Sequence, residues 1–197
     1  MSQLKLWASP DDDGPPKEKR VLDLGMWPDW ATLEEAQDHL EGKLVAGAKC
    51  PCCNQFARVY KRKLNVSMAR FMIWLVRSEA KALSVMASVN RTQQGTYKTS
   101  DRENLWTDIR KCEVRGGDYA KLVHWGLARA KVNTNTKKRT SGFWQTTKLG
   151  RRFAYREVSL PSHVFLYDSQ VIGYFDNRIT IDEALGQEFD YSELMQS

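Results

Sequence analysis

The feature that most limits the possible folds is an apolar stripe along residues 64–76. Large apolar side chains recur there at helical spacing: Leu64, Met68, Phe71, Met72, Leu75 and Val76. Ile73 and Trp74 widen the apolar surface. A helix with so broad an apolar face must be covered by other elements. The pattern therefore predicts a core helix around which a domain is built, not a cofactor-binding segment.

The segments before this helix predict an arm and a small helical element. Residues 1–30 include the run Asp11–Pro16, which is rich in acids and proline, so we expect a flexible arm. Residues 31–63 should hold a helix and a cysteine knuckle. Thr32 and Glu35 form a capping-box pattern at the start of that helix, and Gly47 is a plausible stop. Phe56–Tyr60 alternates like a short strand.

The segment after the core helix predicts alternating short helices and strands within a basic domain at residues 64–156. Ser100 and Glu103 form a second capping-box pattern ahead of Leu105, Trp106 and Ile109. A short helix should follow, with Asp118 as its N-cap and Gly126 at its end. A strand at Leu127–Val132, a polar loop at Asn133–Gly142 and a returning strand at Phe143–Thr146 should come next. Thr147–Phe153 should form a last short helix.

The C-terminal segment, residues 157–197, predicts a hairpin and a short helix. His163–Tyr167 and Gln170–Tyr174 flank Asp168-Ser169, which is a hairpin signal. A helix should begin after Thr180, and Asp182-Glu183 would complement its dipole. The alternation of Phe189, Tyr191 and Leu194 with acids suits packing on the domain or in a partner's groove.

Charge is distributed very unevenly along the chain. The net charge of the whole chain is +6, but residues 110–156 hold 13 bases against Glu113 and Asp118, a net charge of +11. Residues 157–197 hold eight acids against Arg178, a net charge of −7. Such polarity fits either a nucleic-acid face beside a partner-binding or self-masking end, or two surfaces that attract each other.

The order of helix, helix and basic-tipped hairpin resembles that of winged helix-turn-helix proteins. Trp125-Gly126-Leu127 and Thr147–Phe153 stand where those proteins carry the end of the recognition helix and the exit of the wing. The whole chain also resembles small bacteriophage-encoded proteins of unassigned function that carry a Cys-Pro-x-Cys knuckle. The resemblance implies an α+β winged-helix core and double-stranded DNA as the partner. The clustering of bases in loops and at the ends of elements makes the following residues the candidate nucleic-acid contacts: Lys121, His124, Lys137, Lys138, Arg139, Lys148, Arg151, Arg152, Lys61, Arg62 and Lys63.

Three of the four cysteines lie within Cys50-Pro51-Cys52-Cys53-Asn54. This stretch resembles half of a zinc ribbon, with Cys50 and Cys53 as ligands and Asn54 in the left-handed conformation. The second Cys-x-x-Cys is missing, so Cys112, His39, His124 or an adjacent thiol would have to complete the zinc site. A metal-free turn and a redox pair are alternatives, although no βαβ pattern flanks the motif as a redox site would require.

No catalytic pattern accompanies these features. The sequence has no phosphate-binding glycine loop, no Gly-x-Ser-x-Gly elbow and no His-Glu-x-x-His helix, so we expect a protein that is not an enzyme. No apolar run reaches membrane-spanning length and no signal-peptide core is visible, so we expect a cytoplasmic protein with no membrane partner. Two functions remain: DNA binding by a phage-type regulator, or binding of a host protein through the winged fold as a scaffold and the acidic end.

Overall fold

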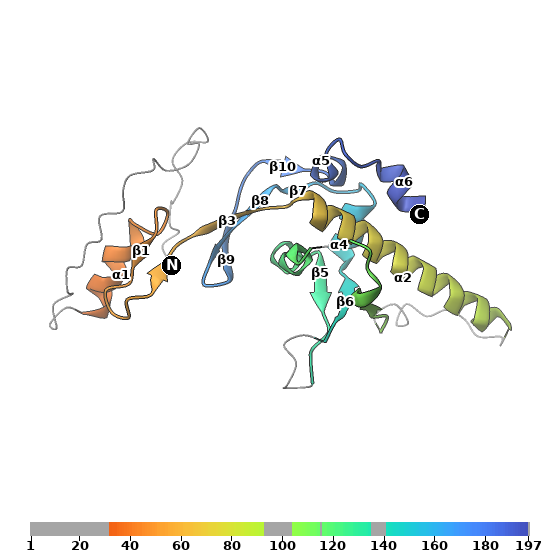
Figure 1. Cartoon of the computed structure of the whole chain (residues 1–197), viewed down its shortest axis with the longest axis horizontal. Helices are drawn as coiled ribbons and strands as arrows, with labels where there is room; N and C mark the ends of the chain where they lie inside the picture. Colours follow the sequence, from red (N-terminus) through yellow and green to blue (C-terminus); the bar gives the residue numbers. More distant parts are fainter. Residues whose placement is uncertain (1–31, 93–103, 115, 135–140, 197) are drawn as a thin grey trace. The chain divides into compact units, whose positions relative to one another are not determined.

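The computed structural model describes residues 32–92, 104–114, 116–134 and 141–196. The chain divides into two compact units, residues 1–60 and residues 61–197. The described part mixes helices with small antiparallel sheets, which confirms the α+β class (Figure 1). None of its helices is both long and apolar enough to span a membrane. The predicted arm lies outside the described residues.

The first unit consists of helix α1 (Leu33–Glu41) and a hairpin of strands β1 (Ala48–Lys49) and β2 (Phe56–Ala57). The predicted capping box is present: the Glu35 N–H donates to the Thr32 hydroxyl at 3.2 Å, and the Thr32 N–H donates to the Glu35 carboxylate at 2.7 Å. The helix ends at Gly42, earlier than the Gly47 stop that we predicted. Gly47 instead turns the chain at a φ of 90°, where the Phe56 ring leaves no room for a Cβ.

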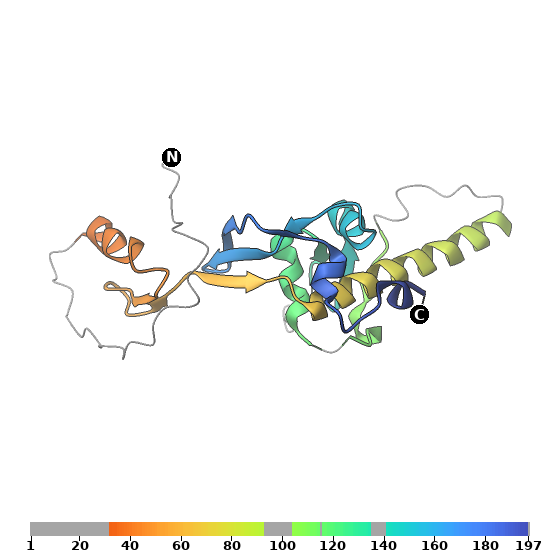
Figure 2. The same ribbon diagram turned by 90° about the horizontal axis from the view of Figure 1, so that it is seen from above.

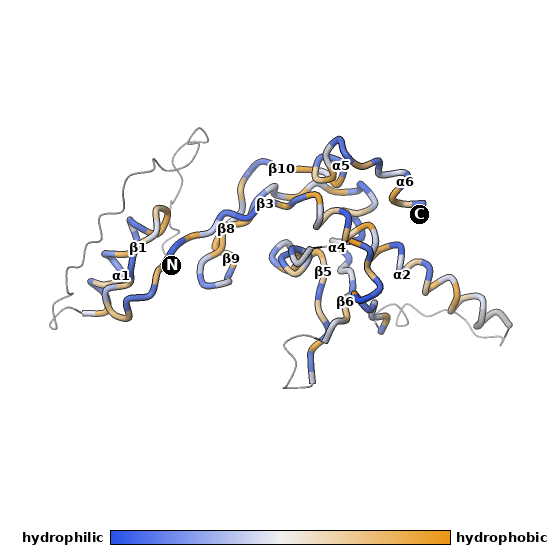
Figure 3. The backbone as a smooth tube through the Cα atoms, viewed as in Figure 1, coloured by the Kyte–Doolittle hydropathy of each residue, from blue (hydrophilic) through white to orange (hydrophobic). Residues whose placement is uncertain are grey.

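Helix α2 (Val66–Thr92) is the central element of the second unit, as the apolar stripe predicted. The Asn65 side chain accepts the Met68 N–H at 3.1 Å and so caps its start. Its first half is buried against η2, α4, α5 and β6. Figure 3 shows the recurring apolar residues, and Figures 1 and 2 show the second half extending beyond the rest of the unit.

The segment after the described end of α2 differs from the prediction. Ser100 to Glu103, the expected start of a helix, lie outside the described residues. The prediction that this helix continues through Leu105 and Ile109 is wrong. Thr107–Asp108 forms strand β4, and Ile109–Lys111 forms the 3₁₀ turn η1, capped by Asp108. Strand β4 pairs with Trp144 and Phe143 of strand β6, so tertiary pairing overrides the local helical pattern.

Strands β4, β6 (Phe143–Thr146) and β5 (Ala128–Ala130) form a sheet in the order β4-β6-β5, here called the wing sheet. Before β5 comes η2 (Asp118–Trp125), which is a 3₁₀ helix. Its N-cap is Gly117, not the predicted Asp118, because the Asp118 carboxylate binds Asn65 and Lys121 instead. Gly126 ends the helix in the left-handed conformation, at a φ of 66°.

Helix α4 (Lys148–Ala154) follows β6 as predicted, with the Thr147 hydroxyl capping the Gly150 N–H at 3.0 Å. A buried carboxylate joins α2 to the end of β6. Glu79 is only 2% exposed, and it accepts the Thr146 N–H at 2.6 Å and the Thr146 hydroxyl at 2.5 Å. Because a buried carboxylate is costly without donors, these bonds fix the register of β6 on α2.

The C-terminal segment is built largely as predicted. Strands β8 (His163–Tyr167) and β9 (Gln170–Tyr174) form the hairpin, with left-handed Asp168 and Ser169 in its turn. Strand β3 (Tyr60–Lys63) adds to β8, giving the order β3-β8-β9. Strand β7 (Leu160–Pro161) pairs with β10 (Arg178–Ile179).

Two short helices complete the second unit. Thr180 and Glu183 form a capping box at the start of α5 (Ile181–Leu185). In α6 (Tyr191–Gln196), the Tyr191 hydroxyl donates to the Ala154 carbonyl at 2.7 Å. Phe189, Tyr191 and Leu194 pack on the core, in agreement with the predicted packing on the domain.

Candidate nucleic-acid interface

The solvent-facing side of the wing sheet combines cations with aromatic rings. Arg129 on β5 lies opposite Gln145 on β6, and two of its guanidinium nitrogens donate to the Gln145 amide oxygen at 2.8 and 2.5 Å. The Arg129 guanidinium lies 5.5 Å from the centre of the Trp106 ring. Lys131, two residues further on, lies 5.8 Å from the centre of the Phe143 ring. These contacts hold two exposed cations on one face of the sheet.

One carboxylate shares this part of the sheet, but it is already paired. Asp108 lies opposite Phe143 and accepts from the Arg110 guanidinium at 2.6 Å. Its hydrogen bonds with Arg110 lower the pKa of Asp108 to about 2. The charge of Asp108 is therefore balanced locally, and Arg129 and Lys131 keep a net positive surface beside it.

Sequence reasoning did not select Arg129, Lys131 or Trp106 as site residues. The usable signal was the spacing of Arg129 and Lys131, since residues two apart in a strand project from the same face. Pairing with β6 then brings Phe143 opposite Lys131. Trp106 gave no such signal, because the predicted helix assigned it to the wrong element.

The candidate residues Lys137, Lys138 and Arg139, which the sequence predicts at the tip of a wing, lie outside the described residues. The strands on either side of this loop are described, and hydrogen bonds join them at the end that leads into the loop. The Lys131 N–H donates to the Phe143 carbonyl at 2.9 Å, and the Ser141 hydroxyl donates to the Lys131 carbonyl at 2.7 Å. The loop therefore starts and ends at the edge of the cationic sheet face.

The two candidate residues on η2 are constrained by their neighbours. The Lys121 ammonium forms an ion pair with the Asp118 carboxylate, which also accepts the Asn65 amide at 3.0 Å. Burial lowers the pKa of His124, and the charge of Lys121 lowers it further, so both disfavour the charged imidazolium. The Tyr174 hydroxyl donates to the His124 carbonyl at 3.1 Å. The η2 helix is thus tied to β9.

The bases of α4 serve different purposes. Lys148 is exposed, and no residue in the described ranges pairs with it. Arg151 is half-buried and donates to the Thr146 carbonyl at 3.1 Å, so it supports the end of β6. Arg152 is exposed and forms an ion pair with Glu157 at 3.2 Å. Lys148 is therefore the α4 base most available to a phosphate.

The three bases of β3 lie on an exposed strand of the β3-β8-β9 sheet. The Lys61 ammonium lies 4.2 Å from the centre of the Phe175 ring. Arg62 lies close enough to Asp118 to lower the pKa of that carboxyl, although Lys121 and Asn65 lower it more. Burial lowers the pKa of His163, and the charges of Lys61 and Lys63 lower it further. The structure therefore places Arg62 near Lys121 but does not bring Lys61, Lys63 and the wing sheet into one cluster.

The cysteine knuckle forms the turn between β1 and β2. The Asn54 N–H donates to the Cys50 carbonyl at 2.8 Å, and the Cys50 N–H donates to the Gln55 carbonyl at 2.7 Å. Asn54 has the predicted left-handed conformation, with a φ of 58°. The backbone N–H groups of Cys53 and Cys52 point at the Cys50 sulfur and lower the pKa of that thiol.

Cys112, a candidate for the third ligand, lies in the second unit. Its thiol donates to the Val114 carbonyl at 3.9 Å, and burial raises its pKa. Within the described ranges, no group of three or more His, Cys, Asp or Glu side chains has the arrangement of a metal site. The knuckle by itself therefore offers an incomplete set of ligands.

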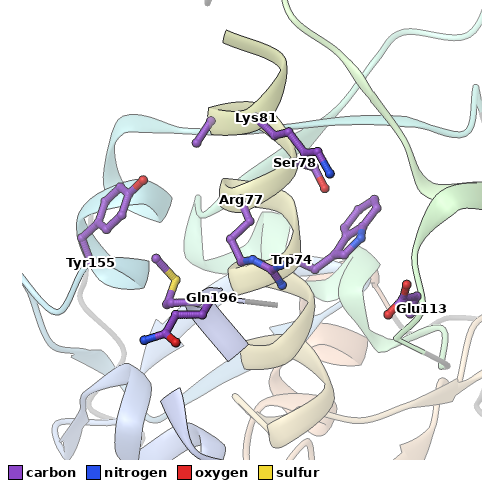
Figure 4. Close-up of a pocket in the computed structure, with 9 residues that line it drawn as sticks. Trp74, Arg77, Ser78, Lys81, Glu113, Tyr155 and Gln196 are labelled. Carbon is purple, nitrogen blue, oxygen red and sulfur yellow. The ribbon is translucent and has the colours of Figure 1, made fainter. Parts of the chain in front are cut away.

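Two hollows lie along the exposed side of α2, and Trp74, Ser78 and Lys81 line both. The first, of about 490 Å³, is also lined by Arg77, with Glu113 and Tyr155 on opposite sides of the helix (Figure 4). The second, of about 780 Å³, reaches the aromatic residues Trp106 and Phe143 of the wing sheet. Their linings mix cations, aromatic rings and single carboxylates.

Comparison with known proteins adds no relative: no family model, curated protein or solved structure matches the chain.

Proposed function

We propose that the protein binds double-stranded DNA without catalysis, through the wing sheet and its loop, in the manner of a winged-helix phage regulator. The observation that carries the proposal is the sheet face on which Arg129 and Lys131 lie beside Trp106 and Phe143. Exposed cations that lead into a basic loop are suited to neutralising phosphates. Because Asp108 is paired with Arg110, it does not cancel this charge.

The order of elements supports the winged-helix part of the proposal. A long helix is followed by strand β4, two short 3₁₀ elements and the hairpin β5–β6, and β4 closes on β6. The departure is η2, which is too short and too constrained to read many bases. We therefore assign most of the binding free energy to phosphate contacts and little sequence selectivity to Lys121.

The test is a salt titration of binding to a duplex, measured by fluorescence anisotropy. Each phosphate contact that is lost should reduce the slope of log affinity against log salt by about 0.9. Changing Lys137, Lys138 and Arg139 together to alanine should reduce the slope by about two to three and weaken binding to all sequences. Changing Arg129 and Lys131 together to glutamine should reduce the slope of log affinity against log salt by about two more.

Arg178→Ala is the matched control, because it removes an exposed base from β10, which belongs to a different sheet from the wing strands. We expect it to leave the slope unchanged. Single-stranded DNA and RNA of the same length should bind less tightly than the duplex. Binding that is absent at low salt, or that the wing substitutions leave intact, would overturn the proposal.

The second candidate is a protein that binds and modulates a host protein, with the winged fold as a scaffold. The constraint on η2 favours it, since Lys121 is paired with Asp118 and the end of the helix is bonded to Tyr174. The acidic end would supply the contact surface. Recovery of the same partner with the tagged protein, both with and without nuclease treatment, would support this candidate if the duplex does not bind.

A further inference from the structure

A second group of cations lies on one face of the β3-β8-β9 sheet, which is separate from the wing sheet (Figure 1). The Lys61 ammonium lies 4.2 Å from the centre of the Phe175 ring. The His163 ring meets the same Phe175 ring edge-on, at 5.7 Å between centres. Residues two apart in a strand project from the same face, so Lys63 shares the face of Lys61. Two ammonium groups and one imidazole are therefore gathered on this face.

A buried hydroxyl fixes the imidazole of His163. The Ser162 Oγ lies 2.9 Å from the His163 Nδ1, and Ser162 is only 2% exposed. The Phe175 N–H donates to the His163 carbonyl at 3.0 Å, which keeps the two rings side by side. Because Nδ1 is engaged by Ser162, Nε2 is the ring nitrogen that can donate to a ligand. The charges of Lys61 and Lys63 add to burial in lowering the pKa of His163, and a bound anion would oppose both lysines.

The sheet itself supplies no carboxylate to balance these cations. Strands β3, β8 and β9 contain no aspartate or glutamate, although residues 157–197 carry a net charge of −7. Among the described residues, no carboxylate forms an ion pair with Lys61, Lys63 or His163, and this includes the neighbouring, exposed Asp176. Like charges that lie together without a counter-charge disfavour one another, so an anion bound here would relieve their repulsion.

We propose that Lys61, Lys63 and His163 bind a dianionic phosphate group. Two ammonium groups match its two negative charges, and donors from three side chains match its three terminal oxygens. A carboxylate fits less well, because it has one charge and two oxygens. Inorganic phosphate and the 5′-terminal phosphate of a nucleic acid share this chemistry. The site lies outside the wing sheet, so binding of inorganic phosphate does not rest on the proposed function.

The first test titrates the full-length protein with inorganic phosphate at constant ionic strength. Isothermal titration calorimetry should show one saturable site. In NMR spectra of the unaltered protein, the imidazole resonances of His163 should shift during the titration, whereas those of His39 and His124 should not. Lys61→Ala and Lys63→Ala should each reduce the affinity for phosphate about fivefold or more.

Arg62→Ala is the matched control, because it removes a base from the same strand. Arg62 lies between the two lysines in sequence, so it projects from the opposite face, where it is close to Asp118. It should change the affinity for phosphate by less than about twofold. Circular dichroism should show that α2 persists in all three variants.

The second test compares a duplex with and without a 5′-phosphate, and it rests on the proposed DNA binding. Tighter binding of the phosphorylated duplex, lost in Lys61→Ala and Lys63→Ala, assigns the site to a nucleic-acid end. Equal binding of the two duplexes, with inorganic phosphate still bound, assigns it to free phosphate. Failure of the duplex to bind at all overturns the proposed function alone. No saturable binding of inorganic phosphate, unmoved His163 resonances, or an equal loss in Arg62→Ala would overturn the phosphate site.

Discussion

Replacing Phe71 by alanine should lower the free energy of unfolding by about 3–5 kcal/mol. Phe71 is 1% exposed and lies where three elements meet. Its ring stacks on Tyr119 of η2 at 4.6 Å between centres, and the Trp144 ring of β6 meets it edge-on at 6.3 Å. The substitution leaves a cavity under both elements and removes these ring contacts.

Denaturant unfolding followed by circular dichroism measures this effect. Val85→Ala is the matched control, because Val85 lies on the same helix and is 58% exposed. It should change the free energy of unfolding by less than about 0.5 kcal/mol. If Phe71→Ala is no more destabilising than Val85→Ala, the first half of α2 is not the core.

Gly150→Ala should destabilise the protein by about 1–3 kcal/mol, the usual cost of an overpacked core. A Cβ at Gly150 would lie 2.0 Å from the Leu127 carbonyl oxygen and 2.9 Å from the Met72 side chain. Because a backbone oxygen cannot rotate away, α4 would have to move away from Leu127, the residue before β5. The sign of this change in stability tests the contact, because replacing glycine by alanine within a helix otherwise stabilises a protein by about 1 kcal/mol.

Thermal and denaturant unfolding both measure this change. Gly117→Ala is the control, because an added Cβ at Gly117 meets nothing within 4 Å. Gly117→Ala should therefore alter only the cap of η2, at a cost below about 1 kcal/mol. A Gly150→Ala protein as stable as the native one would show that α4 and Leu127 are not in direct backbone contact.

The parts of the fold that could be predicted are those encoded by local patterns. The stripe from Leu64 to Val76 gave the core helix, and the Thr32–Glu35 pair gave a helix start, because periodicity and capping act within a few residues. The hairpin turn at Asp168-Ser169 was predictable for the same reason. Each of these signals is complete within one segment of the chain.

The errors arose where a distant partner decides the local structure. The pattern from Ser100 favoured a helix, but Thr107 and Asp108 pair with β6 some 35 residues later. Asp118 was a good cap by its type, yet its carboxylate is taken by Asn65 from before α2. Neither partner can be read from the neighbouring sequence.

The candidate site was predicted by charge rather than by geometry. The density of bases located the basic region, but it did not distinguish exposed cations from those used inside the fold. Arg151 supports the Thr146 carbonyl and Lys121 is paired with Asp118. The role of Arg129 and Lys131 depends on the pairing of β5 with β6, which places both cations on one face of the sheet.

The position of strand β3 in the chain delays the folding of the second unit until late in synthesis. It immediately precedes α2, yet its sheet partner is β8, and the Leu64 N–H bonds the Ser162 carbonyl at 2.9 Å. As the chain leaves the ribosome, β3 emerges about one hundred residues before the strand that completes it. Until then the backbone groups of β3, and the part of α2 that α5 covers, are exposed to other chains. We therefore expect fragments that end before β8 to aggregate, and the second unit to fold only after nearly the whole chain has been made.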